Sequence, residues 1–109
     1  METMEDWINS LKRESCIILV EGKKDKKNLA SFGIRNIITL EGKPLFKTIE
    51  EISEKNKLCI ILTDLDKEGK KLYHALKHNL QKKGVKINDT YRNFLFKKTK
   101  FTQIEGIKV

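Results

Sequence analysis

The sequence is poor in residues that break or cross-link a chain, with one proline and two cysteines in 109 residues. No apolar run approaches the roughly 20 residues of a membrane-spanning helix, so no transmembrane helix and no membrane partner are expected. The first residues include Glu2, Glu5 and Asp6 instead of a basic region followed by an apolar run, which predicts no secretory signal and a cytoplasmic protein. Linker-like and low-complexity tracts are also missing, and the length suits one core, so a single domain over residues 1–109 is expected.

Residues that commonly form disulfides or zinc sites are equally scarce. Cys16 and Cys59 both fall inside predicted apolar strands without metal-ligand spacing, which favours small buried side chains over a disulfide or a zinc site. His74 and His78 lie four residues apart on a predicted helix, a spacing that can bind a metal. No acidic or thiol side chain accompanies them on that turn, so an exposed or half-buried pair is the favoured interpretation.

Charge of one sign dominates: 23 Lys and Arg residues stand against 15 Asp and Glu residues, giving a formal net charge of +8. Most of the basic residues are lysines, which contact phosphate as point charges and carry little base readout. This balance favours a nucleic-acid partner bound largely without sequence preference. The alternative is a lysine-rich surface that serves solubility.

The most informative stretch is Lys57–Lys71. Leu58–Leu62 is an unbroken apolar run, too short for a core helix and typical of a strand buried on both faces of a parallel sheet. Asp64 and Asp66 follow it, and carboxylates at i and i+2 of extended chain point to the same side, close enough to share one cation. The carboxyl edge of an open α/β sheet is where such folds bind ligands.

A second stretch has the same pattern. Cys16–Glu21 matches Cys59–Asp64 position for position and also ends in an acid. If the two strands are parallel neighbours in register, Glu21 and Asp64 end side by side. The pattern then predicts an acidic cluster of Glu21, Asp64 and Asp66 with Asp25 and Glu68 nearby, in which crowding raises the pKa of Glu21.

Alternating strand and helix patterns predict an α/β protein, with a mainly parallel four-stranded sheet between two helix layers and strand order 2-1-3-4. The expected strands are Cys16–Val20, one within Ile34–Leu40, Leu58–Leu62 and Val85–Ile87, with Thr102–Val109 as a possible edge strand.

Helix boundaries are predicted from capping and stop residues. Thr3 and Asp6 resemble a capping box for a helix to about Arg13, and Asp25 is expected to cap a helix that Gly33 ends. Pro44 suits the first turn of a third helix, whose expected buried stripe is Leu45, Phe46, Ile49 and Ile52. A long helix over Lys67–Lys83 and a short one around Tyr91, Phe94 and Leu95 complete the set.

The two strand-and-acid segments, Ile18–Asp25 and Ile61–Gly69, resemble the two signatures of the Toprim domain, which occurs in topoisomerases, bacterial-type primases, some nucleases and the recombination mediator RecR. The resemblance covers roughly Cys16–Asn88. The chain is similar to small free-standing archaeal Toprim proteins, to the Toprim part of ribosomal-RNA-maturing ribonucleases and to that of bacterial-type primases.

This resemblance implies roles at matching positions. Glu21 corresponds to the family's proposed general acid or base, and Asp64 and Asp66 to the pair that holds Mg²⁺, with Mn²⁺ as a second candidate. Glu68 corresponds to a third acid, so the implied metal ligands are Glu21, Asp64, Asp66 and Glu68 and the implied catalytic residues are the first three. Lys70 departs from a further acid often present there, and the chain is too short for a topoisomerase or a complete primase.

Simpler roles remain open for several of these residues. Asp66 and Asp25 can cap helices, and Glu68 can favour a helix N-terminus through the dipole. A lysine cluster beyond Glu21 can guide a phosphate backbone to the metal or can be solvated surface. The candidate nucleic-acid-binding residues are Lys23, Lys24, Lys26, Lys27 and Lys67.

The sequence and the resemblance together predict a Mg²⁺-dependent protein that acts on phosphodiester bonds, ribonuclease-like in its chemistry. The alternative is a non-catalytic adaptor that binds nucleic acid or joins a larger protein complex, as RecR-like use of the fold suggests. A phosphoacceptor receiver domain ranks last, because it needs an acid pair after the first strand and Glu21-Gly22 supplies only one acid.

Overall fold

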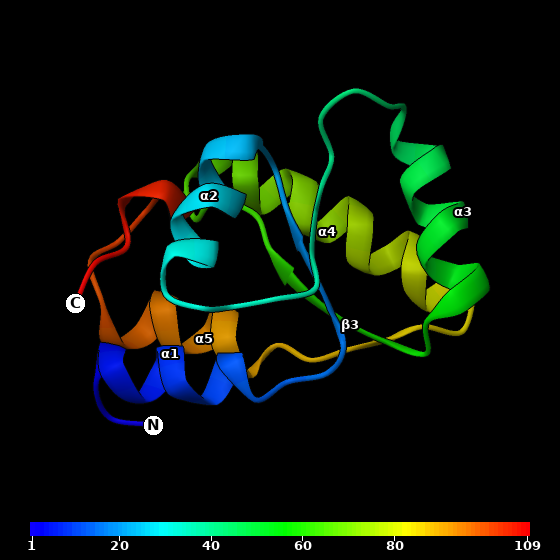
Figure 1. Ribbon diagram of the computed structural model, residues 1–109. Coiled ribbons are helices and arrows are strands. Elements are labelled where there is room, and N and C mark those ends of the chain that lie inside the picture. Colours follow the sequence, from blue (N-terminus) through cyan, green and yellow to red (C-terminus); the bar gives the residue numbers. More distant parts are fainter.

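Four parallel strands form the centre of the structure, a computed structural model that describes residues 1–109. The strands are β1 (Ile17–Val20), β2 (Ile37–Thr39), β3 (Leu58–Leu62) and β4 (Lys86–Ile87). Their order in the sheet is β2-β1-β3-β4, and all three pairings are parallel. The predicted fold class and strand order are therefore confirmed. Figure 1 shows the helices placed around the strands.

Five α-helices connect and cover the strands: α1 (Met4–Lys12), α2 (Lys23–Ser31), α3 (Leu45–Lys55), α4 (Lys67–Lys82) and α5 (Thr90–Lys98). The capping box before α1 is present, because Thr3 Oγ1 accepts from the Asp6 amide at 3.0 Å and Asp6 Oδ2 accepts from the Thr3 amide at 3.2 Å. Gly33 follows α2 with a φ of +87°, the left-handed conformation in which glycine ends a helix without strain.

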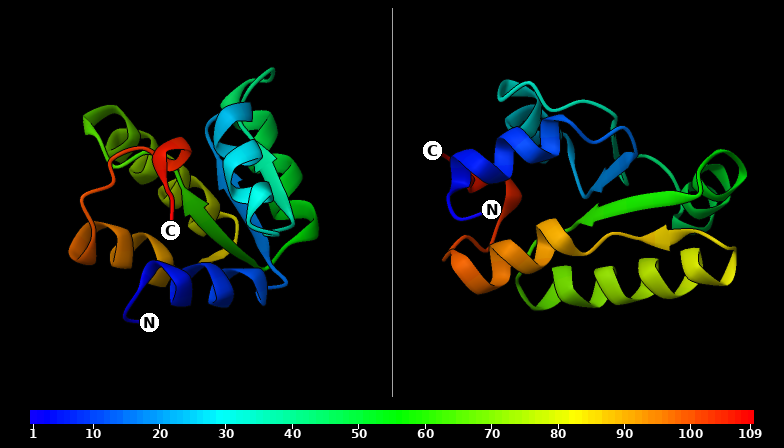
Figure 2. Two further views of the ribbon diagram at one scale, coloured as in Figure 1. Left: turned by 60° about the vertical axis from the view of Figure 1, so that its left-hand side comes forward. Right: turned by 90° about the horizontal axis from the view of Figure 1, so that it is seen from below.

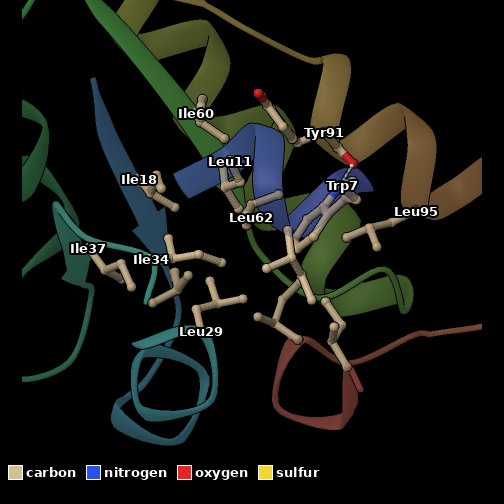
Figure 3. Packing of buried hydrophobic residues seen from close by; sticks show 14 of the residues in the cluster. Trp7, Leu11, Ile18, Leu29, Ile34, Ile37, Ile60, Leu62, Tyr91 and Leu95 are labelled. Atoms are coloured by element: carbon tan, nitrogen blue, oxygen red, sulfur yellow. Dashed lines mark hydrogen bonds between the residues drawn. The ribbon is translucent and has the colours of Figure 1, made fainter. Parts of the chain in front are cut away.

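Alternate strand residues supply two separate cores, one on each face of the sheet. Ile18, Val20, Ile60 and Leu62 pack against α1, α2 and α5, where the Trp7 indole N–H donates to the Tyr91 carbonyl at 3.0 Å (Figure 3). Leu19, Cys59 and Ile61 pack against α3 and α4. Figure 2 shows α4 running alongside β3 and β4, and both chain termini lie at the same end of the molecule.

The expected edge strand over Thr102–Val109 is wrong. The segment instead contains a short 3₁₀ helix, η1 (Ile104–Gly106), and pairs with no strand. Its carbonyls are held by a side chain: Asn28 Nδ2 donates to the Ile104 and Ile107 carbonyls at 2.9 Å each. Ile104 and Ile107 are buried in the core beside α2. Side-chain contacts therefore anchor this C-terminal segment, and strand propensity gives no indication of them.

Three local expectations also need correction. Asp25 does cap α2, but from the first turn: Gly22 is the N-cap, and the Asp25 carboxylate accepts from the Gly22 amide at 3.1 Å, as in a capping box. Pro44 is the N-cap of α3, one residue before its first turn. Phe46 is 66% exposed, because the buried stripe of α3 contains Thr48 with Ile49 and Ile52, and Phe46 lies off that face.

The cysteine side chains are buried or half-buried, and the histidine side chains are exposed to solvent. Cys59 is buried and Cys16 is half-buried, and neither forms a disulfide. Burial raises the pKa of the Cys59 thiol to about 12. His74 and His78 are both exposed. None of the helices has the length and apolar character needed to cross a membrane.

Candidate functional site

The carboxyl ends of β1 and β3 bring Glu21 and Asp64 into contact. The strand pairing sets Val20 opposite Leu62, so continuing the register places Glu21 opposite Thr63, one residue from the match that the sequence pattern suggests. The Glu21 side chain nevertheless reaches across, and its Oε2 accepts from the Asp64 backbone amide at 2.7 Å. The expected neighbourhood of these two acids is present, although the register differs by one residue.

An open cavity of about 580 Å³ lies over this contact. It is lined only by charged residues and one glycine: Glu21, Gly22, Lys23, Lys24, Asp25, Glu41, Asp64 and Glu105. Glu41 and Glu105 are acids that the sequence patterns did not single out. Glu105 is carried to the cavity by the C-terminal segment, which is why no local motif marks it.

Two backbone contacts fix the orientation of Asp64. Its Oδ1 accepts from the Ile104 amide at 2.9 Å, and the neighbouring Leu65 amide donates to the Thr102 carbonyl at 2.7 Å. No donor of the chain contacts Asp64 Oδ2, so this oxygen is available to a ligand. The C-terminal segment therefore positions the side chain that the sequence marks most strongly.

Asp66 and Glu68 lie outside the cavity lining. Asp66 is exposed and caps α4, with Oδ1 accepting from the Gly69 amide at 2.8 Å, as the capping interpretation predicts. Its charge still raises the pKa of both Glu21 and Asp64. Glu68 is exposed and its carboxylate lies 3.8 Å from the Lys71 ammonium. The metal-ligand role of Glu68 stays a prediction that this geometry does not support.

Burial is the main cause of the raised pKa values of the acids at this site. The pKa of Glu21 is raised first by desolvation and then by the charges of Asp64, Asp25 and Asp66, while the hydrogen bond from the Asp64 amide lowers it. Desolvation is also the first cause of the raised pKa of Asp25 and of Asp64. The direction predicted for Glu21 is confirmed, but crowding of like charges is a smaller contribution than burial.

This shift predicts how the metal-free protein responds to pH. Below the ordinary glutamate value of 4.5, Glu21 is protonated in both the folded and the unfolded state and costs nothing. As the pH rises through its higher folded-state pKa, the native protein must hold a charge that the unfolded chain holds more easily, so stability is lost. Glu21→Gln removes this loss and keeps an acceptor for the Asp64 amide. In EDTA, the melting temperature of Glu21→Gln relative to wild type should rise between about pH 4 and about pH 7; a constant or falling difference would contradict the burial argument.

Arg92 is the functional neighbour that the sequence analysis missed. Its guanidinium is buried beside the loop of residues 63–66, which we call the aspartate loop. There Nη1 donates to the Thr63 carbonyl at 2.6 Å and Nη2 donates to the Asp64 carbonyl at 2.9 Å. The ring of Tyr73 lies 4.4 Å from the guanidinium carbon. Arg92 thus holds the backbone that presents Asp64 and places a positive charge under the acidic cavity. Its only sequence signal is its position among the apolar residues of α5.

The candidate phosphate-binding lysines are dispersed around the cavity. Lys23 and Lys24 line it, and Lys24 and Lys27 also line an adjoining hollow of about 340 Å³. Lys26 is exposed outside both, and Lys67 is exposed at the start of α4.

The carboxylate oxygens of Glu21 and Asp64 are suitable ligands for a hard divalent cation, but the protein supplies few of them. No three histidine, cysteine or carboxylate side chains converge closely enough to hold a metal between them, so the four implied ligands do not form a closed site. Mg²⁺ commonly binds one or two carboxylates and leaves its other positions to water and substrate phosphate. Glu21 and Asp64 line the same cavity, and the Glu21 carboxylate is bound to the Asp64 amide, so these two residues fit that requirement.

The family model for the Toprim domain matches residues 16–104. The chain belongs to the Toprim family. The match continues past Asn88 into the C-terminal segment that contacts Asp64, so the family region is longer than the two motifs suggest.

Relatives with this domain differ in size and in name. A UPF0292 protein of Methanocaldococcus jannaschii is 30% identical over 88% of this chain and 75% of its own length. The DNA primase DnaG of the same organism is 43% identical over 55% of this chain, which is only 14% of the primase. Ribonuclease M5 of Mesoplasma florum is 44% identical over 55% of this chain and 37% of the ribonuclease.

The likeness to a solved structure extends over almost the whole chain. A protein from Aquifex aeolicus superimposes with a TM-score of 0.92 at 37% identity, covering 98% of this chain and 100% of the other. The predicted similarity to free-standing Toprim proteins, primases and ribosomal-RNA-maturing ribonucleases is thus confirmed at the level of the domain.

Proposed function

We propose that this Toprim protein is a Mg²⁺-dependent enzyme that cleaves phosphodiester bonds in nucleic acid, with RNA as the favoured substrate. The contact between Glu21 Oε2 and the Asp64 amide is the observation that carries the proposal, because it holds the Glu21 carboxylate beside Asp64, whose side chain lines the same cavity. The relatives named as a DNA primase and a ribonuclease support nucleic-acid processing. The shared ribonuclease segment, together with the lysine-rich charge, supports the finer statement.

Each residue has a stated part in the proposal. Asp64, through its unpaired Oδ2, and Glu21 bind the cation, and Asp66 contributes negative potential from the cap of α4. Bound Mg²⁺ would neutralise the negative charge that builds up on the phosphate oxygens during phosphoryl transfer. When it does not ligate the cation, Glu21, whose pKa is raised by burial, accepts a proton from the attacking oxygen or donates one to the leaving oxygen. Lys23 and Lys24 attract the flanking phosphates.

Metal binding tests the site independently of turnover. The variant Asp64→Asn/Asp66→Asn keeps both hydrogen-bond acceptors, for the Ile104 and Gly69 amides, but removes two charges. Titration with Mg²⁺ or Mn²⁺ should raise the melting temperature of wild type and leave that of the variant nearly unchanged. In EDTA the variant should melt no lower than wild type, because like charges are relieved. An equal metal response in both proteins would remove these aspartates from the site.

Cleavage of labelled RNA and DNA by the purified protein, with and without Mg²⁺, tests the activity itself. We expect Mg²⁺-dependent cleavage by wild type and none by the double variant. Binding without cleavage would instead favour the second candidate, a non-catalytic nucleic-acid adaptor of a larger complex. The sparse carboxylate set, in which no three acids converge, is the observation that keeps this candidate open.

A further inference from the structure

Phe96 is an apolar side chain in a place where packing does not require one. It lies on α5 and is 61% exposed, with the Lys70 ammonium 5.0 Å from its ring centroid. Beside it is a hollow of about 250 Å³ whose lining includes Leu65, Lys100 and Phe101. An exposed aromatic ring next to cationic side chains has the composition of a surface that stacks nucleic-acid bases.

Two lysines lie beside this ring: the Lys70 ammonium is close to it, and both Lys70 and Lys100 line the adjoining hollow. On α4, Lys67, Lys70 and Lys71 are spaced i, i+3 and i+4 and therefore share a face. Lys97, Lys98 and Lys100 follow Phe96 along the chain, and all six lysines are exposed. Only Lys71 has an acidic partner, Glu68 at 3.8 Å. We call Phe96, Lys67, Lys70, Lys71 and Lys100 the Phe96 surface. Its four lysines outnumber the two acids at the start of α4, Asp66 and Glu68, so the surface carries a local excess of positive charge.

The Phe96 surface adjoins the aspartate loop. Leu65, which lies between Asp64 and Asp66 in the chain, lines the hollow beside Phe96. Its amide is bound to the Thr102 carbonyl, so loop and hollow form one rigid edge. Asp64 lines the acidic cavity and Leu65 lines the hollow beside Phe96, so these two neighbouring side chains face different hollows. The Phe96 surface and the acidic cavity are thus connected through adjacent residues of one loop.

We propose that the Phe96 surface binds single-stranded nucleic acid, with an unpaired base stacked on Phe96 and the flanking phosphates contacted by the lysines. The inference rests on the proposed function in one respect, namely that the bound strand is the substrate of the nearby carboxylates. A duplex buries its base faces in its own stack and offers none to Phe96. A protein partner would require a larger exposed apolar area, because Leu65 and Leu95 in this hollow are buried and Phe101 is half-buried. Lys70 is exposed, so it can leave the ring for a phosphate when a base arrives.

The test compares two exposed phenylalanines of the full chain. Phe96→Ala is the test variant and Phe46→Ala, 66% exposed on α3, is the matched control. Binding of fluorescently labelled oligouridine of about 12 nucleotides, within the usual range of single-strand site sizes, is measured by anisotropy in EDTA at low salt. Loss of one stacked base should weaken binding about 5- to 100-fold for Phe96→Ala. Phe46→Ala should change the Kd less than about 2-fold, because no lysine-flanked hollow accompanies that ring.

Two further arms separate stacking from charge. Phe96→Trp should bind as tightly as wild type, since the larger ring also stacks, and a duplex of the same length should bind equally to wild type and Phe96→Ala. Equal losses for both alanine variants, or equal losses on duplex and single strand, would overturn the inference. Retained Mg²⁺-dependent cleavage with an unchanged Kd for Phe96→Ala would reject this surface while leaving the proposed activity intact. Stacking at Phe96 without any cleavage by wild type would do the reverse.

Discussion

Replacing Glu21 with glutamine should slow Mg²⁺-dependent cleavage by about 10²- to 10⁴-fold, the usual worth of general acid-base assistance. Glutamine keeps the volume of the side chain and an oxygen that can accept from the Asp64 amide, so the strand ends should stay in place. The substitution removes the titratable carboxyl group, whose pKa burial raises above the ordinary glutamate value. Nucleic-acid affinity should stay constant or rise slightly, because one negative charge near the phosphates is removed.

Single-turnover cleavage with saturating protein measures this effect without interference from product release. Glu50→Gln, an exposed position on α3, is the control for the loss of one negative charge. It should cleave at the wild-type rate. If Glu21→Gln cleaves as fast as Glu50→Gln, then Glu21 only terminates a strand and the proton-transfer role is wrong. If cleavage falls together with Mg²⁺ affinity, Glu21 acts chiefly as a metal ligand.

Much of the fold could be predicted because its determinants are local. The isoleucine-rich runs of β1 and β3 are fully apolar, which distinguishes buried parallel strands from amphipathic elements. Thr3 and Gly33 mark helix ends through contacts within a few residues. The strand order could be inferred because the matched pattern suggested pairing of the two acid-tipped strands, and right-handed crossovers were then combined with that pairing.

The parts of the site that sequence reasoning missed depend on contacts between distant residues. Ile104 binds Asp64 across 40 positions, and Arg92 binds the Asp64 carbonyl across 28. Neither contact leaves a periodic pattern, and a buried arginine contradicts the usual expectation that charge lies on the surface. The i, i+2 spacing of Asp64 and Asp66 likewise does not reveal that Asp66 caps α4 and lies outside the cavity lining, and the four-residue ligand set stays a prediction.

Gly69→Ala should be among the most damaging single substitutions in this protein. A β-carbon at this buried position would overlap the carbonyl group of Asp64 and lie 2.9 Å from its Cα. That backbone cannot retreat easily, because Arg92 holds the Asp64 carbonyl at 2.9 Å and Glu21 holds its amide at 2.7 Å. Overpacking against fixed backbone falls in the upper range of single-residue effects, so we expect a loss of at least about 3 kcal/mol. Urea unfolding should show this loss as a lower midpoint.

Gly106→Ala provides the matched control for that variant, because no atom lies within 4 Å of the β-carbon it would add. Its stability should stay within about 0.5 kcal/mol of wild type, as for most surface substitutions. Any Gly69→Ala protein that remains folded should also lose its melting response to Mg²⁺, since the displaced Asp64 carries the ligand oxygen. A Gly69→Ala protein with wild-type stability and an intact metal response would show that the aspartate loop tolerates a shift of its backbone. The close approach of α4 to Asp64 would then not be what positions the carboxylate.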